Sequence, residues 1–191
     1  MELDESIARL GAKLDEWFDG NVDTFASRDP VAQVKALLRG TEIAKELDRC
    51  KAGGLAALTA LLERQDASTE DERRASLVRG FEFGSRLAHT LHDELLDTNG
   101  ETKVVRLMHA IVGALDGIGS GRAALAVLLD HPDAGVRASA AAYLVNLMPD
   151  RAVPILREID QKEGGSSADF TAHWALLAWE LKQKAKAGSP D

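Results

Sequence analysis

The chain has 191 residues, of which 31 are acidic and 23 basic, so its formal charge is −8 at pH 7. Because this charge repels phosphate backbones and anionic headgroups, we expect no nucleic-acid partner and no membrane partner. Hydrophobic residues make up 45% of the chain and aromatic residues only 5%. That composition is typical of helices that pack closely through alanine and leucine, and it predicts an all-α protein.

Cysteine content and the absence of long apolar runs indicate the compartment. Cys50 is the single cysteine, which excludes an intrachain disulfide and a cysteine-based zinc site and fits a reducing environment. We find no apolar run near eighteen residues and no basic leader followed by an apolar stretch. We therefore expect a cytoplasmic protein, and no sequence feature calls for a cofactor.

Helical periodicity begins near the N-terminus. Apolar residues recur at helical spacing over residues 4–18, and the pattern stops at Gly20. A second helix is predicted from Pro30 to about residue 50, because proline is favoured in the first turn. A third helix is predicted over about 55–64.

A longer helix is predicted to begin after Ser68 or Thr69, because the three acidic residues that follow suit the positive end of a helix dipole. Its apolar line continues to Leu95, and Asn99-Gly100 is expected to end it. Further helices are predicted at about 101–116, 121–130, 134–148, 152–162 and 168–186. No segment alternates as a half-buried strand would, so the sequence predicts about eight or nine helices.

The chain also repeats itself. Residues 54–66 and 121–133 agree at seven of thirteen positions without a gap, which indicates a duplicated three-helix unit. We therefore predict a single helical-repeat domain over residues 1–186. The expected units are a first degenerate one at about 31–98 and a second at about 101–183, with residues 187–191 as a tail.

The stretch DHPDAGVRASAAAYL, residues 130–144, places an Asp/Pro turn before a Val-Arg pair and a run of alanines. With its flanks, at about 121–160, it resembles a HEAT-type repeat. Residues 101–183 resemble more narrowly a small bacterial family of HEAT-like proteins, the DUF2019 group. The resemblance implies stacked antiparallel helix pairs, and similar helical-repeat proteins include immunity proteins of bacterial toxin systems.

Within this stretch Asp133 is placed to cap the amides of the helix that follows. Ala138 and Ala141 would let a partner helix approach closely. The resemblance implies that Arg137 forms a polar link between repeats. His131 stands where the family has its usual aspartate, and its role stays open.

The sequence HTLHDE places His89, His92 and Asp93 at spacings that share a helix face. With His109 from the next helix, they would supply the ligands of a metal ion. His92 also lies near the core line of its helix at about 100° per residue, a position typical of a histidine at the edge of a core. Of the three interpretations, a metal site, a polar contact with a partner and a structural cluster, we favour the structural one.

The surfaces expected to bind a partner are acidic or aromatic. Residues 1–30 carry eight carboxylates and three basic side chains, and opposite charge speeds and orients association with a basic protein. Trp174 and Trp179 are five residues apart and cannot share one helical stripe, so one is expected in the core and the other partly exposed. The predicted contact residues are Asp15, Glu16, Asp19, Glu82, Arg86 and Trp174.

No sequence motif specifies catalysis. GIGSG, residues 117–121, lacks a preceding strand and a following GK[ST], so it predicts a turn between helices and not a phosphate loop. Together with the acidic charge, the resemblance to helical-repeat immunity proteins implies a non-enzymatic protein-binding module, an immunity or adaptor protein that binds a basic surface of a toxin. Two alternatives stay open: a metal-dependent helical enzyme that uses the histidine cluster, and a structural module that forms oligomers of a size the sequence does not specify.

Overall fold

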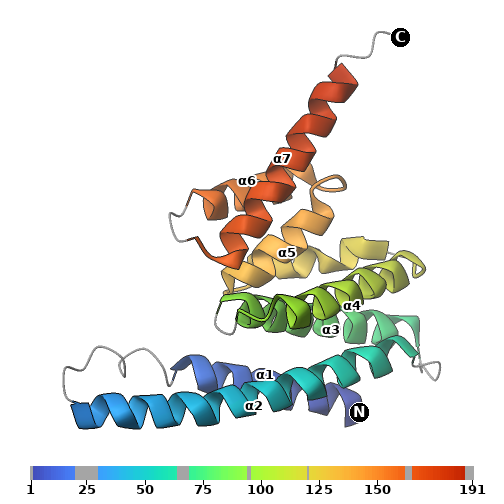
Figure 1. Ribbon diagram of the computed structural model, residues 1–191. Helices are drawn as coiled ribbons and strands as arrows, with labels where there is room; N and C mark the ends of the chain where they lie inside the picture. Colours follow the sequence, from blue (N-terminus) through green and yellow to red (C-terminus); the bar gives the residue numbers. More distant parts are fainter. Residues whose placement is uncertain are drawn as a thin grey trace. The chain divides into compact units, whose positions relative to one another are not determined.

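The computed structural model describes the backbone of residues 2–19, 30–63, 69–93, 96–119, 121–161 and 165–187. Within these ranges every regular element is a helix, seven of them α-helices and one a 3₁₀ helix (Figure 1). The all-α prediction is confirmed. The chain divides into two compact units, unit 1 at Met1–Asp66 and unit 2 at Ala67–Asp191.

Unit 1 is a pair of helices, α1 (Glu2–Asp19) and α2 (Pro30–Glu63), that pack against each other. The predicted break between residues 50 and 55 is wrong, because α2 runs through it without interruption. Gly53 sits inside the helix and faces α1: a β-carbon there would lie 3.4 Å from Leu10 Cδ2. The glycine therefore serves close helix packing and not a turn.

Unit 2 begins with α3 (Glu70–Asp93) and α4 (Thr98–Asp116), which lie side by side (Figure 1). Asn99-Gly100 was predicted to end the first of these helices, and this is wrong. Asp97 caps α4 by accepting a hydrogen bond from the Gly100 N–H at 2.8 Å, so both residues lie in the first turn of α4. A side-chain acceptor at the cap satisfies an amide that the helix itself cannot.

A turn over residues 117–119, as predicted, leads into η1 (Gly121–Asp130). The segment is helical over the predicted range, but its helix is 3₁₀ and unusually long for that type. Gly121 begins it at φ +54°, a backbone conformation that glycine adopts without strain. Across the turn the Arg122 guanidinium pairs with the Asp116 carboxylate, which lowers the pKa of that carboxyl.

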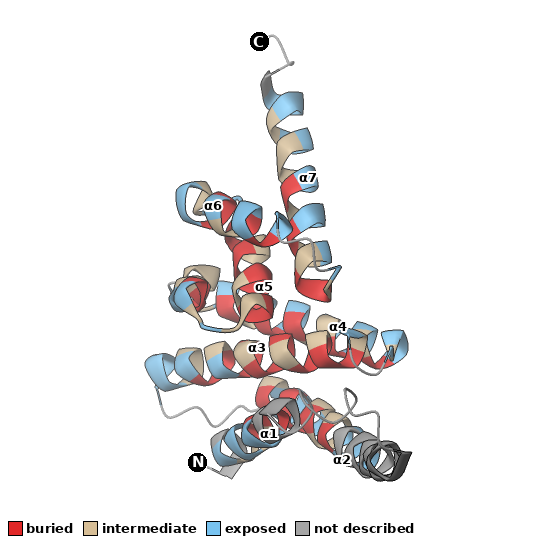
Figure 2. Cartoon of the chain, turned by 90° about the vertical axis from the view of Figure 1, so that its left-hand side faces the viewer, coloured by how far each residue is buried: buried red, intermediate tan, exposed pale blue. Residues whose placement is uncertain are grey.

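The helix α5 (Ala134–Leu144) packs on η1 and ends four residues before the predicted limit. Pro149 keeps the helix from extending through Met148, because a proline disfavours helical backbone in the residue before it, and Met148 has φ −133° and ψ 59°. Residues 145–147 form turns between α5 and the next helix. Two more helices follow, α6 (Pro149–Asp160) and α7 (Ser167–Ala187). The helix α7 contacts α6, α5 and α3, and its C-terminal half projects beyond them (Figures 1 and 2).

The core of unit 2 is apolar and formed by all of its helices (Figure 2). Ala138 and Ala141 are fully buried, as expected for residues that allow close helix contact. The large side chains with least exposure are Leu77, Phe81, Leu87, Leu91, Ile111, Leu115, Leu125, Leu129, Leu144 and Leu156. Leu95, the last residue of the predicted apolar line, lies outside the described residues.

The two segments that match in sequence differ in structure. Residues 54–63 are part of the long α-helix of unit 1, whereas residues 121–130 form the 3₁₀ helix of unit 2. The range 31–98, expected as the first repeat, extends from unit 1 into unit 2. The sequence match therefore does not correspond to a shared conformation.

The turn before α5 is stabilised by its own side chains. Asp133 caps the helix as predicted, accepting from the Val136 N–H at 3.0 Å. Arg137, expected to link repeats, instead donates to the carbonyls of His131 and Pro132 at 2.7 and 2.8 Å. The contact between helices is made by His131, whose Nε2 lies 3.3 Å from Glu82 Oε1 on α3.

Candidate ligand pocket and exposed helix face

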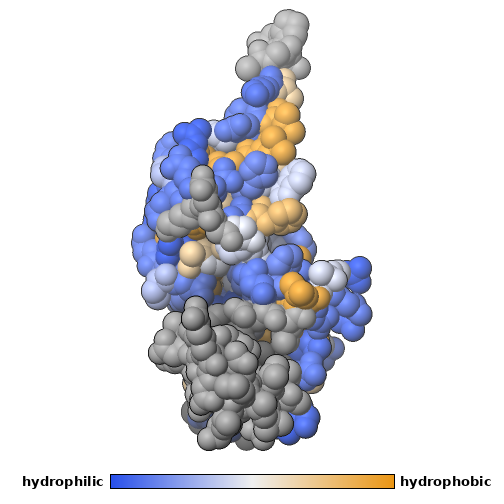
Figure 3. Space-filling view, turned by 60° about the vertical axis from the view of Figure 1, so that its left-hand side comes forward, coloured by the Kyte–Doolittle hydropathy of each residue, from blue (hydrophilic) through white to orange (hydrophobic). Residues whose placement is uncertain are grey.

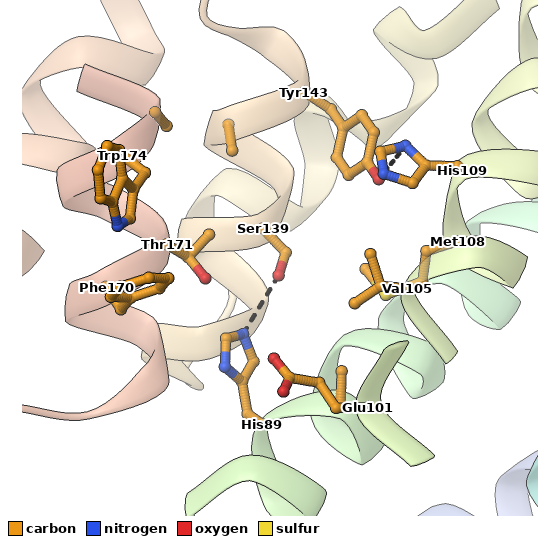
Figure 4. Close-up of a pocket in the computed structure, with 13 residues that line it drawn as sticks. His89, Glu101, Val105, Met108, His109, Ser139, Tyr143, Phe170, Thr171 and Trp174 are labelled. Carbon is orange, nitrogen blue, oxygen red and sulfur yellow. Dashed lines mark hydrogen bonds between the residues drawn. The ribbon is translucent and has the colours of Figure 1, made fainter. Parts of the chain in front are cut away.

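A pocket of about 480 Å³ opens in unit 2 between α3, α4, α5 and α7 (Figure 4). Its size falls in the range of small-molecule sites. Each of the four helices contributes side chains to it. The lining consists of Ala88, His89, Glu101, Val105, Met108, His109, Ser139, Ala142, Tyr143, Phe170, Thr171, Trp174 and Ala175.

A line of hydrogen bonds crosses the floor of the pocket. His89 Nδ1 lies 2.6 Å from Ser167 Oγ, and the Ser167 hydroxyl and N–H both donate to the Asp93 carboxylate at 2.8 Å. On the other side of the ring, Nε2 lies 3.0 Å from the Gly135 carbonyl and 3.2 Å from Ser139 Oγ. The line ties α3 to the N-terminal turns of α5 and α7.

A neutral His89 can complete the line through Ser139, because its Nδ1–H can donate to Ser167 Oγ while its Nε2 accepts from the Ser139 hydroxyl. Only the contact with the Gly135 carbonyl then lacks a hydrogen. Burial lowers the pKa of His89, against the opposing effects of Asp133, Gly135 and Asp93, because removal from water disfavours the charged ring.

The order serine, histidine, serine, aspartate resembles that of a nucleophile and its base, but the backbone does not suit acyl transfer. Ser139 lies within α5, where the neighbouring N–H groups are used by the helix. An oxyanion would need such donors directed at it. The line is therefore better suited to orient His89 at the pocket floor than to activate Ser139.

Glu101 supplies the carboxylate of the pocket. Its Oε2 lies 2.9 Å from His92 Nδ1, and this hydrogen bond raises the pKa of His92. Figure 4 shows the Glu101 carboxylate directed toward the His89 ring at the floor. The thirteen lining residues include this one carboxylate and neither lysine nor arginine.

Aromatic rings form the upper walls of the pocket. On α7, Phe170 and Trp174 meet edge to face with ring centroids 5.8 Å apart. On the opposite wall the Tyr143 hydroxyl lies 2.8 Å from His109 Nδ1 (Figure 4). Burial raises the pKa of Tyr143 to about 12, so the phenol is protonated at neutral pH.

The four candidate metal ligands do not converge. His89 bonds to Ser167, His92 to Glu101, Asp93 to Ser167 and His109 to Tyr143. In the described ranges no group of three or more histidine, cysteine, aspartate or glutamate side chains is arranged to hold a metal ion. The shared helix face proposed from the spacing therefore serves hydrogen bonds: His89 and Asp93 meet through Ser167, and His92 pairs with Glu101.

The predicted partner-binding residues have different positions. The side chains of Asp15, Glu16 and Asp19 lie outside the described residues. Glu82 and Arg86 are partly buried on α3 and do not line the pocket. Trp174 does line it and is half exposed, whereas Trp179 is partly buried, in line with the expectation that the two differ.

A second feature, the α7 stripe, consists of the exposed apolar residues Phe170, Trp174, Leu177 and Leu181. Their exposed fractions are 61%, 53%, 37% and 56%. Spacings of four, three and four place all four on one face of the helix. Ala168, Ala172 and Leu176 are buried on the opposite face, so α7 is apolar on both sides.

Sequence reasoning missed several of these residues. Ser139 and Ser167 are the polar positions at which α5 and α7 meet His89, and serine in such segments gave no specific signal. Gly135, in the first turn of α5, was not singled out. The stripe on α7 did carry a signal, because its spacing is helical and lies out of phase with the buried residues.

No protein-family model matches this chain, and comparisons with curated proteins and with solved structures give no significant match. In the described part of the chain, no helix is long and apolar enough to cross a membrane. The pocket and the α7 stripe are thus the features of unit 2 from which a function can be inferred.

Proposed function

We propose that this chain is a non-enzymatic protein-binding module, an immunity or adaptor protein that binds and neutralises a cognate toxin. The single observation that supports the proposal is the α7 stripe. Four large apolar side chains lie exposed in one row, and a contiguous apolar patch of this kind on a protein surface is typical of a binding site. Figure 3 shows hydrophobic surface along the projecting part of α7.

The stripe suits an amphipathic helix of a partner protein. A row at helical spacing offers ridges into which a second helix packs, with anchors from large aromatic side chains. Its extent from Phe170 to Leu181 corresponds to about 16 Å at 1.5 Å per residue. That length matches about three turns of a partner helix.

Charge supports a partner of opposite sign. The whole chain carries −8, which favours approach of a basic protein. The last turns of α7 differ locally, because Lys182, Lys184 and Lys186 are exposed there. The partner segment over that end of the stripe is therefore expected to carry acidic side chains.

The proposed architecture is HEAT-like. In unit 2, α3 packs with α4, η1 with α5, and α6 with α7, which supports a stack of helix pairs. From this pairing and from the resemblance of residues 101–183 to the DUF2019 group, we propose that unit 2 is a HEAT-like array of a bacterial cytoplasmic protein. The buried thiol of Cys50 supports a reducing compartment.

The test is capture of partners by the purified chain in extracts of its native organism, followed by growth assays. Leu177→Glu places a charge in the stripe at a side chain that the core does not need. Val127→Glu is the matched control, because Val127 is exposed at 68% on η1, outside the stripe. The proposal expects one identified protein to be captured by the wild type and by V127E but not by L177E.

The captured protein is then expressed alone in a host. The proposal expects growth arrest that the wild-type chain relieves and L177E does not. Capture that is equal for L177E and the wild type would contradict the role of the stripe. Sedimentation of the purified chain provides a further check. If the wild type forms dimers and L177E is monomeric, the stripe binds a second copy of the chain instead.

A further inference from the structure

The pocket shares Phe170 and Trp174 with the α7 stripe, but its other lining residues give it a chemistry of its own. Phe170 and Trp174 form its aromatic wall, and Val105 and Met108 contribute apolar surface from α4 (Figure 4). Aromatic faces attract cations through the negative charge above the ring, most strongly for tryptophan. A ligand with an apolar chain that ends in a cation could contact the apolar surface with its chain and the aromatic rings with its charge.

The charge of the lining has one sign. Glu101 is the carboxylate among the thirteen lining residues, which include no lysine or arginine. Its Oε2 is paired with His92, and its Oε1 makes no hydrogen bond with any residue that the structure describes. Its side chain is 27% exposed, so a ligand can reach the carboxylate, and the surrounding apolar surface strengthens its field.

The hydroxyls and rings at the floor add polar groups without adding positive charge. His89 contributes a neutral ring at pH 7, since burial lowers its pKa. Thr171 and Ser139 contribute hydroxyl groups that accept as well as donate. An anionic ligand would meet the Glu101 carboxylate with no lysine or arginine in the lining to offset the repulsion.

We propose that this pocket binds an organic cation, an ammonium or guanidinium group carried on a short apolar chain. The cation lies between the Glu101 carboxylate and the Trp174 ring, and the apolar chain contacts Val105, Met108 and Phe170. This site goes beyond the proposed function, since the purified chain alone suffices to test it. Its failure would leave the partner-binding role of the stripe untouched.

Three probes of equal length test the proposal: hexylammonium, hexanol and hexanoate. Binding is followed by titration calorimetry and by the indole N–H signal of Trp174 in nuclear magnetic resonance spectra. The expected order of affinity is hexylammonium, then hexanol, with hexanoate weakest. Equal binding of hexylammonium and hexanol, or tighter binding of hexanoate, would overturn the proposal.

Glu101→Gln keeps the shape of the side chain and removes its charge. It is expected to weaken hexylammonium binding by about tenfold and to leave hexanol binding unchanged, because only the charged hydrogen bond is lost. Glu82→Gln is the matched control, since Glu82 also faces a histidine, His131, but lies outside the pocket. Unchanged hexylammonium affinity in E101Q would overturn the proposal.

A helical peptide with one lysine flanked by leucines distinguishes the two sources of such a cation. Tighter binding of this peptide than of hexylammonium, lost in E101Q, assigns the cation to a lysine of a partner protein. Binding of the peptide no tighter than that of hexylammonium assigns it to a free amine. Either result keeps the cation site, and failure of both probes to bind removes it.

Discussion

Gly135 and His89 approach each other so closely that a β-carbon on Gly135 would lie 2.4 Å from Cδ2 of His89. The same ring lies 3.0 Å from the Gly135 carbonyl and 2.6 Å from Ser167 Oγ. The imidazole therefore cannot move aside without losing bonds on both of its nitrogens. The glycine is required by this contact and not by its backbone angles.

Gly135→Ala is expected to lower the free energy of unfolding by about 1–3 kcal/mol, the usual cost of overfilling a packed site. Gly113→Ala is the control, since nothing lies within 4 Å of a β-carbon at that exposed helical position. There, alanine should raise the free energy of unfolding by about 0.5–1 kcal/mol, because glycine costs entropy in a helix. Urea denaturation measures both.

A double-mutant cycle checks the physical cause of the G135A effect. With His89→Ala in place, the methyl group of Ala at position 135 no longer meets a ring. The cost of the second substitution should then fall well below its cost in the wild type. Equal costs in the two backgrounds would show that the backbone, and not the ring, needs the glycine.

The lowered pKa of His89 makes stability depend on pH. Below its ordinary pKa of 6.5 the unfolded chain takes up a proton before the folded chain does. The contribution of His89 to the free energy of unfolding is therefore complete above pH 6.5 and falls as the pH drops through the pKa of the folded chain. Below that pKa the contribution changes no further. Urea midpoints between pH 8 and pH 4 should show this fall, and His89→Gln should remove it.

His92 should act in the opposite direction. Its hydrogen bond to Glu101 raises its pKa above 6.5, so its contribution is complete below pH 6.5 and is lost as the pH rises through the folded pKa. Glu101→Gln should return the pKa of His92 toward 6.5, as measured by titration of the ring signals. In the E82Q control the pKa of His92 should stay raised. If it also stays raised in E101Q, Glu101 is not the cause of the shift.

Leu176 and Leu177 are neighbours in the chain but lie on opposite faces of α7. Leu176 is 7% exposed and Leu177 37%. Leu176→Ala should cost about 2–4 kcal/mol of folding stability through the cavity it leaves, whereas Leu177→Ala should change it by less than about 0.5 kcal/mol. Thermal and urea unfolding measure the pair. Similar costs would mean that the stripe is part of the core.

Periodicity predicted most helices but not the places where tertiary contacts override local signals. Apolar spacing placed α1, α3, α4 and α7 within a few residues of their observed bounds. The predicted break between residues 50 and 55 was wrong because the sequence does not reveal whether Gly53 ends a helix or admits Leu10 of a neighbour. The 3₁₀ form of η1 could not be predicted either, since its apolar pattern also fits an α-helix.

For the site, the sequence singled out His89, His92, Asp93, His109 and Trp174. It did not reveal which residues each of them contacts. Helical spacing places residues on a face and says nothing of the helix opposite. Two partners of the His89 ring, Ser167 and Gly135, are 78 and 46 residues away from it in sequence. A single sequence holds no information on such pairs, so the network appears only in three dimensions.

A helix that is apolar on two opposite faces has a consequence for the life of the chain in the cell. The buried face of α7 is satisfied by folding, whereas the row from Phe170 to Leu181 is open to water in the chain alone. If this row is the proposed binding surface, chains made in excess of the partner would adhere to one another through it and be lost to aggregation or proteolysis. Synthesis of the two proteins in matched amounts would keep the row covered.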